Sequence, residues 1–136
     1  MKGIADTGFI VAAADRDDRY HDWAANLAKA VTEPLLTCEP VLAEAAYRLR
    51  SAAQVLAMVE DGLLQVAFEC SEHIRSLQEL ARRYADREPD LADLCLIRMS
   101  ELYPRHVVIT VDPNDFRIYR RNKREAIPLL CPPRAH

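Results

Sequence analysis

The 136-residue sequence is poor in glycine, has no paired cysteine motif and contains no long apolar segment. Its three glycines lie too far apart to form the glycine-rich phosphate loop of a P-loop NTPase or a dinucleotide-binding protein. The G-x-S-x-G pattern of α/β-hydrolases is also missing. No apolar run approaches the roughly 20 residues that span a membrane, and the N-terminus has no signal-peptide core. We therefore expect a cytoplasmic protein without membrane association.

The cysteines and histidines are scattered along the chain and form no recognisable metal-binding pattern. The four cysteines, Cys38, Cys70, Cys95 and Cys131, include no C-x-x-C pair, which favours reduced and mostly buried thiols over a disulfide framework or a zinc site. The formal net charge of −3 gives no overall attraction to nucleic acid. Any binding of nucleic acid must therefore depend on a local basic patch.

Short apolar segments alternate with helical segments along the whole sequence. Strands are predicted in the stretch 4–9, where we expect the strand to stop at Asp6, and at 35–37, 63–68, 106–111 and 126–130. The predicted helices between them include segments 40–49 and 51–59, an amphipathic helix capped by Ser71, and 91–102. This alternation indicates an α/β fold with a single domain over residues 1–136. We expect a mainly parallel sheet of about five strands with helices on both faces.

One carboxylate, Asp6, interrupts the first apolar stretch. Burying an unpaired carboxylate costs several kcal/mol, so such a residue is normally hydrogen-bonded, ion-paired or bound to a metal. If the strand ends at Asp6, the side chain points to the sheet edge where parallel α/β proteins bind their ligands. Alternatively, Asp6 caps a helix that begins near Gly8. The local sequence leaves both interpretations open.

Three further acids occupy comparable positions: Glu44 in the helix after the second strand, Asp93 in the helix from Leu91, and Asp112 after the strand that begins near His106. Carboxylates that converge in a cleft repel one another, so a fold that gathers them must supply a cation. Oxygen ligands without Cys or His select Mg²⁺ or Mn²⁺. Together with Asp6, these residues predict a metal site.

Each acid also has a simpler interpretation. Glu44 is spaced to pair with Arg48 on the next helical turn. Asp90 and Asp93 fit the N-cap and N3 positions of a helix, and for Asp90 capping is the preferred interpretation. Asp112 and Asp115 are common turn residues. Only the combination of four acids at strand and helix ends favours a metal site.

Five segments in order resemble the PIN-domain family, particularly the VapC-type ribonuclease toxins of bacterial toxin–antitoxin modules. These segments are Ile4–Phe9, Asp18–His21, Val41–Glu44, Asp90–Asp93 and Thr110–Phe116. The resemblance implies that Asp6, Glu44, Asp93 and Asp112 bind the metal and catalyse the reaction. It also implies that Thr7, Asp90, Thr110 and Asp115 support this site. One departure is Leu94, which follows Asp93 where the family often has Ala.

The resemblance implies a Mg²⁺-dependent endoribonuclease that cleaves single-stranded RNA, with Mn²⁺ as a possible substitute. It further implies a type II toxin that is inhibited by a protein antitoxin, and we expect a homodimer. The alternatives are a PIN nuclease of RNA processing, a non-catalytic PIN-like module that binds RNA or protein, and a Mg²⁺-dependent phosphohydrolase on a related sheet. All four acids are present, which argues against the non-catalytic alternative.

A basic segment near the C-terminus is the predicted RNA contact. It carries five cationic side chains, Arg117, Arg120, Arg121, Lys123 and Arg124, and Tyr119 is expected to stack on a base. The simpler alternative is a solvated loop whose charge only keeps the protein soluble.

Overall fold

A central five-stranded parallel sheet organises the computed structural model, which describes residues 1–133. The strand order is β3-β2-β1-β4-β7, so the first strand lies in the middle of the sheet. The strands are β1 (Gly3–Ala5), β2 (Leu35–Thr37), β3 (Leu64–Val66), β4 (Val107–Ile109) and β7 (Leu129–Leu130). All neighbouring pairs in this sheet are parallel. The predicted α/β class and parallel sheet are confirmed.

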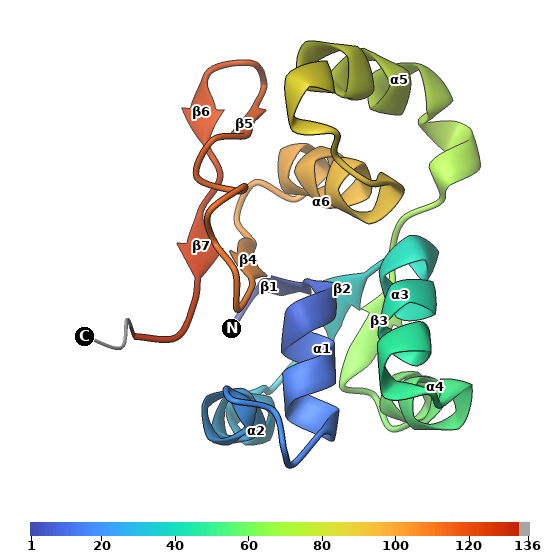
Figure 1. Cartoon of the computed structure of the whole chain (residues 1–136), viewed down its shortest axis with the longest axis vertical. Helices are drawn as coiled ribbons and strands as arrows, with labels where there is room; N and C mark the ends of the chain where they lie inside the picture. The colour runs from blue at the N-terminus through green and yellow to red at the C-terminus, as the bar shows by residue number, and fades with distance from the viewer. Residues whose placement is uncertain (134–136) are drawn as a thin grey trace.

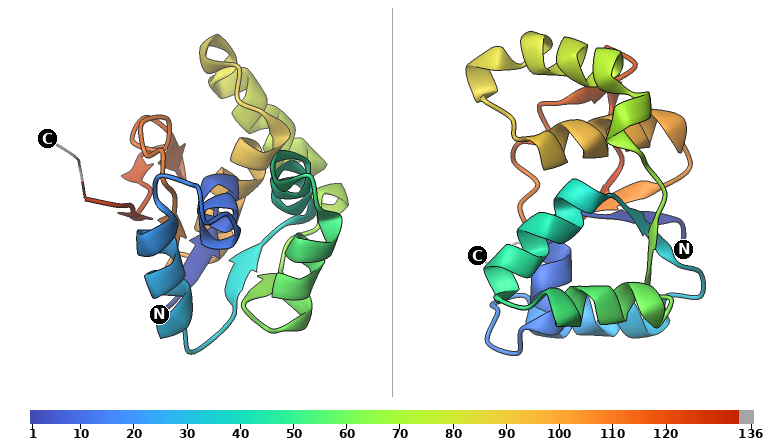
Figure 2. Two further views of the ribbon diagram at one scale, coloured as in Figure 1. Left: turned by 60° about the horizontal axis from the view of Figure 1, so that its bottom comes forward. Right: turned by 90° about the vertical axis from the view of Figure 1, so that its right-hand side faces the viewer.

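Helices cover both faces of the sheet, as predicted (Figures 1 and 2). In the right-hand view of Figure 2, α5 and α6 lie on one side of the sheet and α3 and α4 on the other. The six α-helices of residues 1–133 are α1 (Thr7–Ala14), α2 (His21–Ala30), α3 (Glu39–Leu49), α4 (Ala52–Glu60), α5 (Ile74–Arg83) and α6 (Leu91–Leu102). None of these helices is long and apolar enough to cross a membrane.

The central strands are buried because they are covered on both faces. Every residue of β1 and β2 is buried, which explains why these strands read as continuous apolar runs rather than alternating ones. Ala5 of β1 pairs with Ile109 of β4. The carboxyl ends of these two strands therefore lie side by side, directly before Asp6 and Thr110.

Of two predicted boundaries near helices, one is confirmed and one was wrong. The first strand ends at Ala5, directly before Asp6, and Thr7 already begins α1. Ser71 does not cap the fifth helix, since residues Cys70–Glu72 form a short 3-10 helix, η1, and α5 begins only at Ile74. A second 3-10 helix, η2 (Ala85–Arg87), follows α5 and leads toward Asp90, the N-cap of α6.

The C-terminal region also differs from the prediction, because the expected last strand is divided in two. Its beginning, β6 (Glu125–Ala126), pairs with β5 (Arg120–Arg121) in a separate antiparallel hairpin. Its end forms β7 at the edge of the main sheet. Pro128 lies between them and has no N–H to donate, while its carbonyl accepts the N–H of Val108 at 2.8 Å. The last residues of the predicted domain, 134–136, lie outside the described residues.

Candidate active site

Asp6 serves both roles that the sequence left open. It is the N-cap of α1, and its Oδ1 atom accepts the N–H of Thr7 at 2.7 Å. Its own N–H donates to the Ile109 carbonyl at 3.0 Å, which holds Asp6 at the end of the sheet. The cap therefore places the carboxylate at the carboxyl edge of β1 and β4, where parallel sheets bind ligands.

Thr110 connects the ends of the two central strands. Its hydroxyl group donates to Asp6 Oδ2 at 2.7 Å and accepts the N–H of Asp112 at 3.1 Å. The Thr110 residue is 0 % exposed, so this network is fixed by packing. Both oxygen atoms of the Asp6 carboxylate are thus oriented, and the backbone of Asp112 is tied to the same network.

Gly8 allows the loop after β4 to approach the start of α1. A Cβ atom built on Gly8 would lie 2.5 Å from Cγ2 of Val111, which is too close for any ordinary contact. The glycine therefore lets Val111 and the following Asp112 lie against the N-terminal turn of α1. A larger residue at position 8 would have to displace the Val111 side chain.

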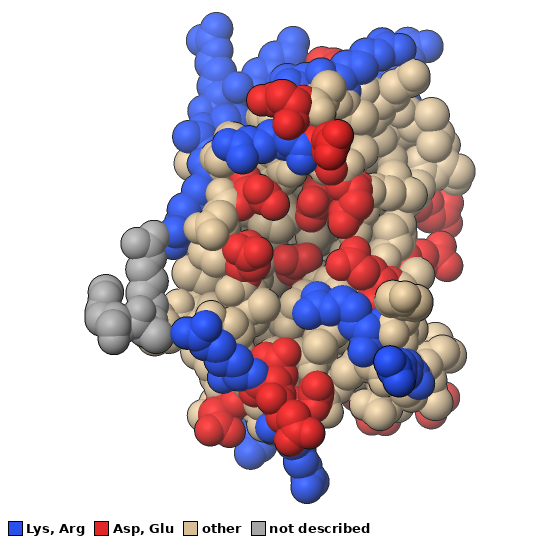
Figure 3. Space-filling view, viewed as in Figure 1, with Lys and Arg blue, Asp and Glu red and all other residues tan. Residues whose placement is uncertain are grey.

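Five carboxylates line one pocket at this sheet edge. The pocket has a volume of about 230 Å³, and its charged lining residues are Asp6, Glu44, Asp93, Asp112, Asp115 and Arg48. We call this the acidic pocket. Acidic side chains also gather in the middle of the face shown in Figure 3, between groups of basic side chains. The structure thus brings together all four acids singled out in the sequence, from α1, α3, α6 and the loop after β4.

Burial and mutual repulsion make the charged forms of three carboxylates unfavourable. Burial, followed by the negative charges of neighbours including Asp90 and Asp6, raises the pKa of Asp93 to about 7. The same two causes raise the pKa of Glu44, against a smaller effect of Arg48. Burial also raises the pKa of Asp6, although hydrogen bonds from Thr110 and Thr7 oppose it. The pocket therefore holds negative charge that a cation would relieve.

The donor atoms suit a hard divalent cation, but the side chains do not form a ready-made metal site. Within residues 1–133, no three Asp, Glu, His or Cys side chains are placed closely enough together to hold a metal ion. One buried polar atom in the pocket lining, Thr7 Oγ1, has no hydrogen-bond partner in this part of the chain. The oxygen-rich lining and this unpaired hydroxyl group fit Mg²⁺ or Mn²⁺ in chemistry.

A sequence model of the PIN domain matches residues 4–122, which is most of the chain. The chain belongs to the PIN-domain family. PIN domains are generally nucleases, so the family supports a hydrolase that acts on nucleic acid. A comparison with curated proteins found no significant match.

The residues expected to support the site of this PIN domain differ in their placement. Thr7 lines the acidic pocket and Thr110 lies buried behind it. Asp90 is exposed and caps α6 by accepting the N–H of Asp93 at 2.8 Å, which confirms the capping interpretation. Asp115 lines the pocket, and its charge contributes to the raised pKa of Asp93. Asp115 therefore lines the same pocket as the four proposed ligands.

Arg48 is a cation of the acidic pocket that the motif comparison did not include. It lines the pocket from α3, one helical turn after Glu44. Among the described residues the two side chains form no ion pair within 4.0 Å, so the simple pairing expected from their spacing is not observed. The i, i+4 spacing from Glu44 was nevertheless the sequence signal that could have placed Arg48 near the pocket, since it puts both residues on one helix face.

Two arginines of the basic segment are engaged in the fold of this PIN domain. Arg120 donates to the carbonyls of Arg117 at 2.7 Å and Tyr119 at 3.1 Å. Arg121 binds Glu125 at 3.1 Å and the carbonyls of Ser100 and Pro104, and its side chain is only 11 % exposed. Arg121 is therefore held within the fold, whereas Arg120 takes part in these contacts through Nη1 alone. RNA binding by the whole segment stays a prediction.

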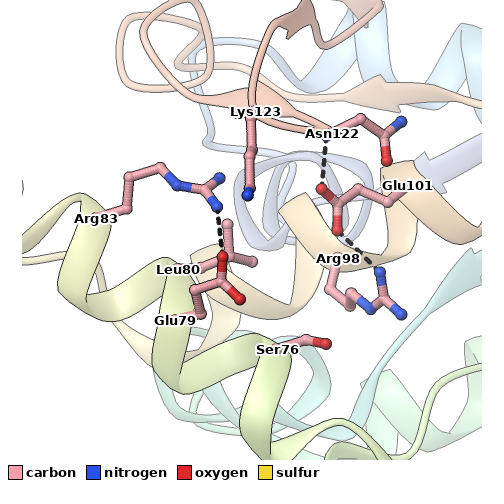
Figure 4. A pocket seen from close by; sticks show the side chains of 8 residues that line it. All are labelled: Ser76, Glu79, Leu80, Arg83, Arg98, Glu101, Asn122 and Lys123. Carbon is pink, nitrogen blue, oxygen red and sulfur yellow. Dashed lines mark hydrogen bonds and ion pairs between the residues drawn. The ribbon is translucent and has the colours of Figure 1, made fainter.

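Tyr119 cannot stack on a base as predicted, because it is 1 % exposed and packs edge-to-face against Tyr84 and Phe116. Arg117, Lys123 and Arg124 remain exposed. Lys123 extends into a second pocket of about 350 Å³ between α5, α6 and the β5–β6 turn, opposite Arg83 (Figure 4). The exposed cations of the basic segment are therefore Arg117 and the two residues at the β5–β6 turn, Lys123 and Arg124.

Proposed function

We propose that this PIN domain is a Mg²⁺-dependent endoribonuclease that cleaves single-stranded RNA at the acidic pocket. The observation that carries this proposal is the gathering of five carboxylates in one pocket at the carboxyl end of the central strands, where burial and mutual repulsion raise the pKa of Asp93. A stable fold gains nothing from such repulsion, so strongly perturbed carboxylates in a cleft point to a functional site.

In this proposal the metal is held by Asp6, Glu44, Asp93 and Asp112. Asp115 is a fifth carboxylate that can donate an oxygen atom to it. When bound, the metal supplies positive charge and acidifies a water molecule for attack on a phosphodiester. Asp6 is held in one orientation by Thr7 and Thr110, so it needs no reorganisation. Arg48 offers a cation to the phosphate from the wall of the same pocket.

The decisive experiment is a cleavage assay on single-stranded RNA with purified protein. Cleavage is expected in Mg²⁺ or Mn²⁺ and should stop in excess EDTA, because all proposed ligands are oxygen donors. A small phosphate monoester in a parallel reaction separates the nuclease from a general phosphohydrolase. RNA cleavage that persists in excess chelator would contradict the metal-dependent mechanism.

At a finer level we propose that the nuclease is the toxin of a type II toxin–antitoxin module. Two exposed apolar side chains on the adjoining helices α3 and α4 support a protein partner: Tyr47 is 83 % and Leu56 61 % exposed. Such a partner could be the antitoxin or a second copy of the chain, and an acidic pocket is well suited to receive a basic side chain from it.

Coexpression with the neighbouring reading frame tests the toxin proposal. The expected result is a complex in which the partner suppresses RNA cleavage, and growth arrest when the nuclease is expressed alone. Harmless expression of an active nuclease, with no copurifying partner, would instead favour a role in RNA processing.

A further inference from the structure

Three of the four cysteines, far apart in the sequence, meet in the structure. The Sγ atoms of Cys70 and Cys95 lie 3.3 Å apart. Cys95 also lies next to Cys38, and the interaction of the two thiols lowers the pKa of Cys38. We call Cys38, Cys70 and Cys95 the thiol cluster. No C-x-x-C motif predicts it, because the three residues come from the N-cap of α3, from η1 and from α6.

The members of the thiol cluster differ in their access to solvent. Cys38 and Cys95 are completely buried, whereas Cys70 is only partly buried. A small oxidant can therefore reach Cys70 and not the other two. All three are free thiols. The sulfur atoms of Cys70 and Cys95 lie about 1.3 Å farther apart than the roughly 2.05 Å of an S–S bond, so a modest movement of the two side chains would bring them to bonding distance.

We propose that Cys70 and Cys95 form a reversible oxidation site for hydroperoxides, with Cys70 as the reacting thiol and Cys95 as the resolving thiol. In the first step the Cys70 thiolate attacks a peroxide oxygen, the O–O bond breaks, and sulfenic acid and water form after proton transfer. In the second step the Cys95 sulfur attacks the Cys70 sulfur and expels hydroxide, which takes up the thiol proton as water. Two thiols and one hydrogen peroxide thus give one disulfide and two water molecules.

The disulfide would join two segments that lie far apart in the sequence. Cys70 belongs to η1, which leads from the sheet into α5, while Cys95 lies in α6 two residues after Asp93. Oxidation would therefore tie the helix that carries Asp93 to the segment that enters α5. The proposal does not depend on nuclease activity, because the bond and its location can be measured directly.

The test treats the purified full-length chain with a small excess of hydrogen peroxide and counts thiols after unfolding. The expected result is the loss of two of the four thiols and of the mass of two hydrogen atoms, restored by dithiothreitol. Peptide mapping should find Cys70 joined to Cys95. Unchanged thiols, a bridge between other cysteines or between two chains, or oxygen addition without a bridge would overturn the proposal.

Single substitutions assign the roles. Cys70→Ser, at a partly exposed position, should abolish the disulfide. Cys95→Ala should stop the reaction at the Cys70 sulfenic acid, which dimedone traps as a covalent adduct. Cys131→Ser is the matched control, since Cys131 is also a partly buried free thiol, and it should oxidise like the wild type. A disulfide that survives Cys70→Ser, or is lost with Cys131→Ser, would contradict the assignment. Because Cys70→Ser and the wild-type peptide map suffice, a poorly folded Cys95→Ala protein does not weaken the test.

Discussion

Asp93→Asn is expected to reduce RNA cleavage by at least about 100-fold, which corresponds to roughly 2.7 kcal/mol of transition-state stabilisation. The proposed metal would lose a charged ligand in the acidic pocket, and Asn supplies at best a neutral oxygen. The competing explanation is structural, because Asp93 also lies in the first turn of α6. As a helix-end acid alone it would contribute about 0.3 to 1 kcal/mol to stability and little to cleavage.

Stability measurements of the metal-free protein separate the two explanations. The folded-state pKa of Asp93 is about 7, above its ordinary value of 3.8, so the folded protein binds the proton more tightly than the unfolded chain. The contribution of Asp93 to the free energy of unfolding is therefore expected to be most favourable below about pH 4 and to fall as the pH rises toward 7. Solvent screens this half-buried carboxylate, so we expect a loss on the order of 1 to 2 kcal/mol rather than the full value of the shift.

Asp93→Asn should remove much of this pH-dependent fall in the free energy of unfolding. Without metal the variant is expected to be more stable than the wild type at pH 8 and nearly equal to it near pH 4. Added Mg²⁺ should stabilise the wild type more than the variant, because that gain follows metal affinity. Denaturant unfolding at both pH values, with and without Mg²⁺, measures these differences.

Asp22→Asn is the matched control, since Asp22 is the exposed first-turn acid of α2 and does not line the acidic pocket. It should lower stability slightly at pH 8 and leave cleavage unchanged. If Asp93→Asn behaved like this control, Asp93 would be a helix-end acid and the metal site would have to be built from the other carboxylates.

The local features of the site could be predicted from the sequence because they depend on a few neighbouring residues. A carboxylate that interrupts an apolar strand close to Gly8 can be accommodated in only a few ways. In the structure Asp6 combines two of them, as the N-cap of α1 and as a carboxylate at the ligand-binding edge of the sheet. The capping role of Asp90 likewise follows from its position directly before a helical segment. Parallel strands then bring such positions to one edge.

Features that depend on long-range packing could not be predicted in this way. Arg121 looks like any exposed cation in the sequence, yet it donates to the carbonyl of Ser100 in α6 and to that of Pro104 just after this helix, 21 and 17 residues earlier in the chain. Tyr119 similarly turns inward onto Tyr84. Local periodicity reports which face of an element is apolar, but it does not identify the segment that will cover that face. The meeting of Cys70 and Cys95 has the same origin.

Lys123→Gln is expected to weaken RNA binding and to lower its salt dependence, leaving the acidic pocket intact. Lys123 is exposed at the tip of the β5–β6 hairpin and extends toward Arg83 across the second pocket (Figure 4). In Figure 3, basic side chains lie above the central acidic group, over α5 and this hairpin. RNA with its scissile phosphate in the acidic pocket would therefore place neighbouring phosphates near these cations, offsetting repulsion from the carboxylates.

The measurement is the slope of log affinity against log salt concentration for single-stranded RNA, in Ca²⁺ or with an inactive variant to prevent cleavage. Loss of one phosphate contact should lower the slope by about 0.7, since fewer counterions are released. Lys29→Gln is the control, because it removes another exposed lysine, from the last turn of α2, without changing the hairpin. If both substitutions changed the slope equally, the effect would reflect net charge alone. A drop confined to Lys123→Gln would locate an RNA phosphate at the hairpin, because the two variants carry the same net charge.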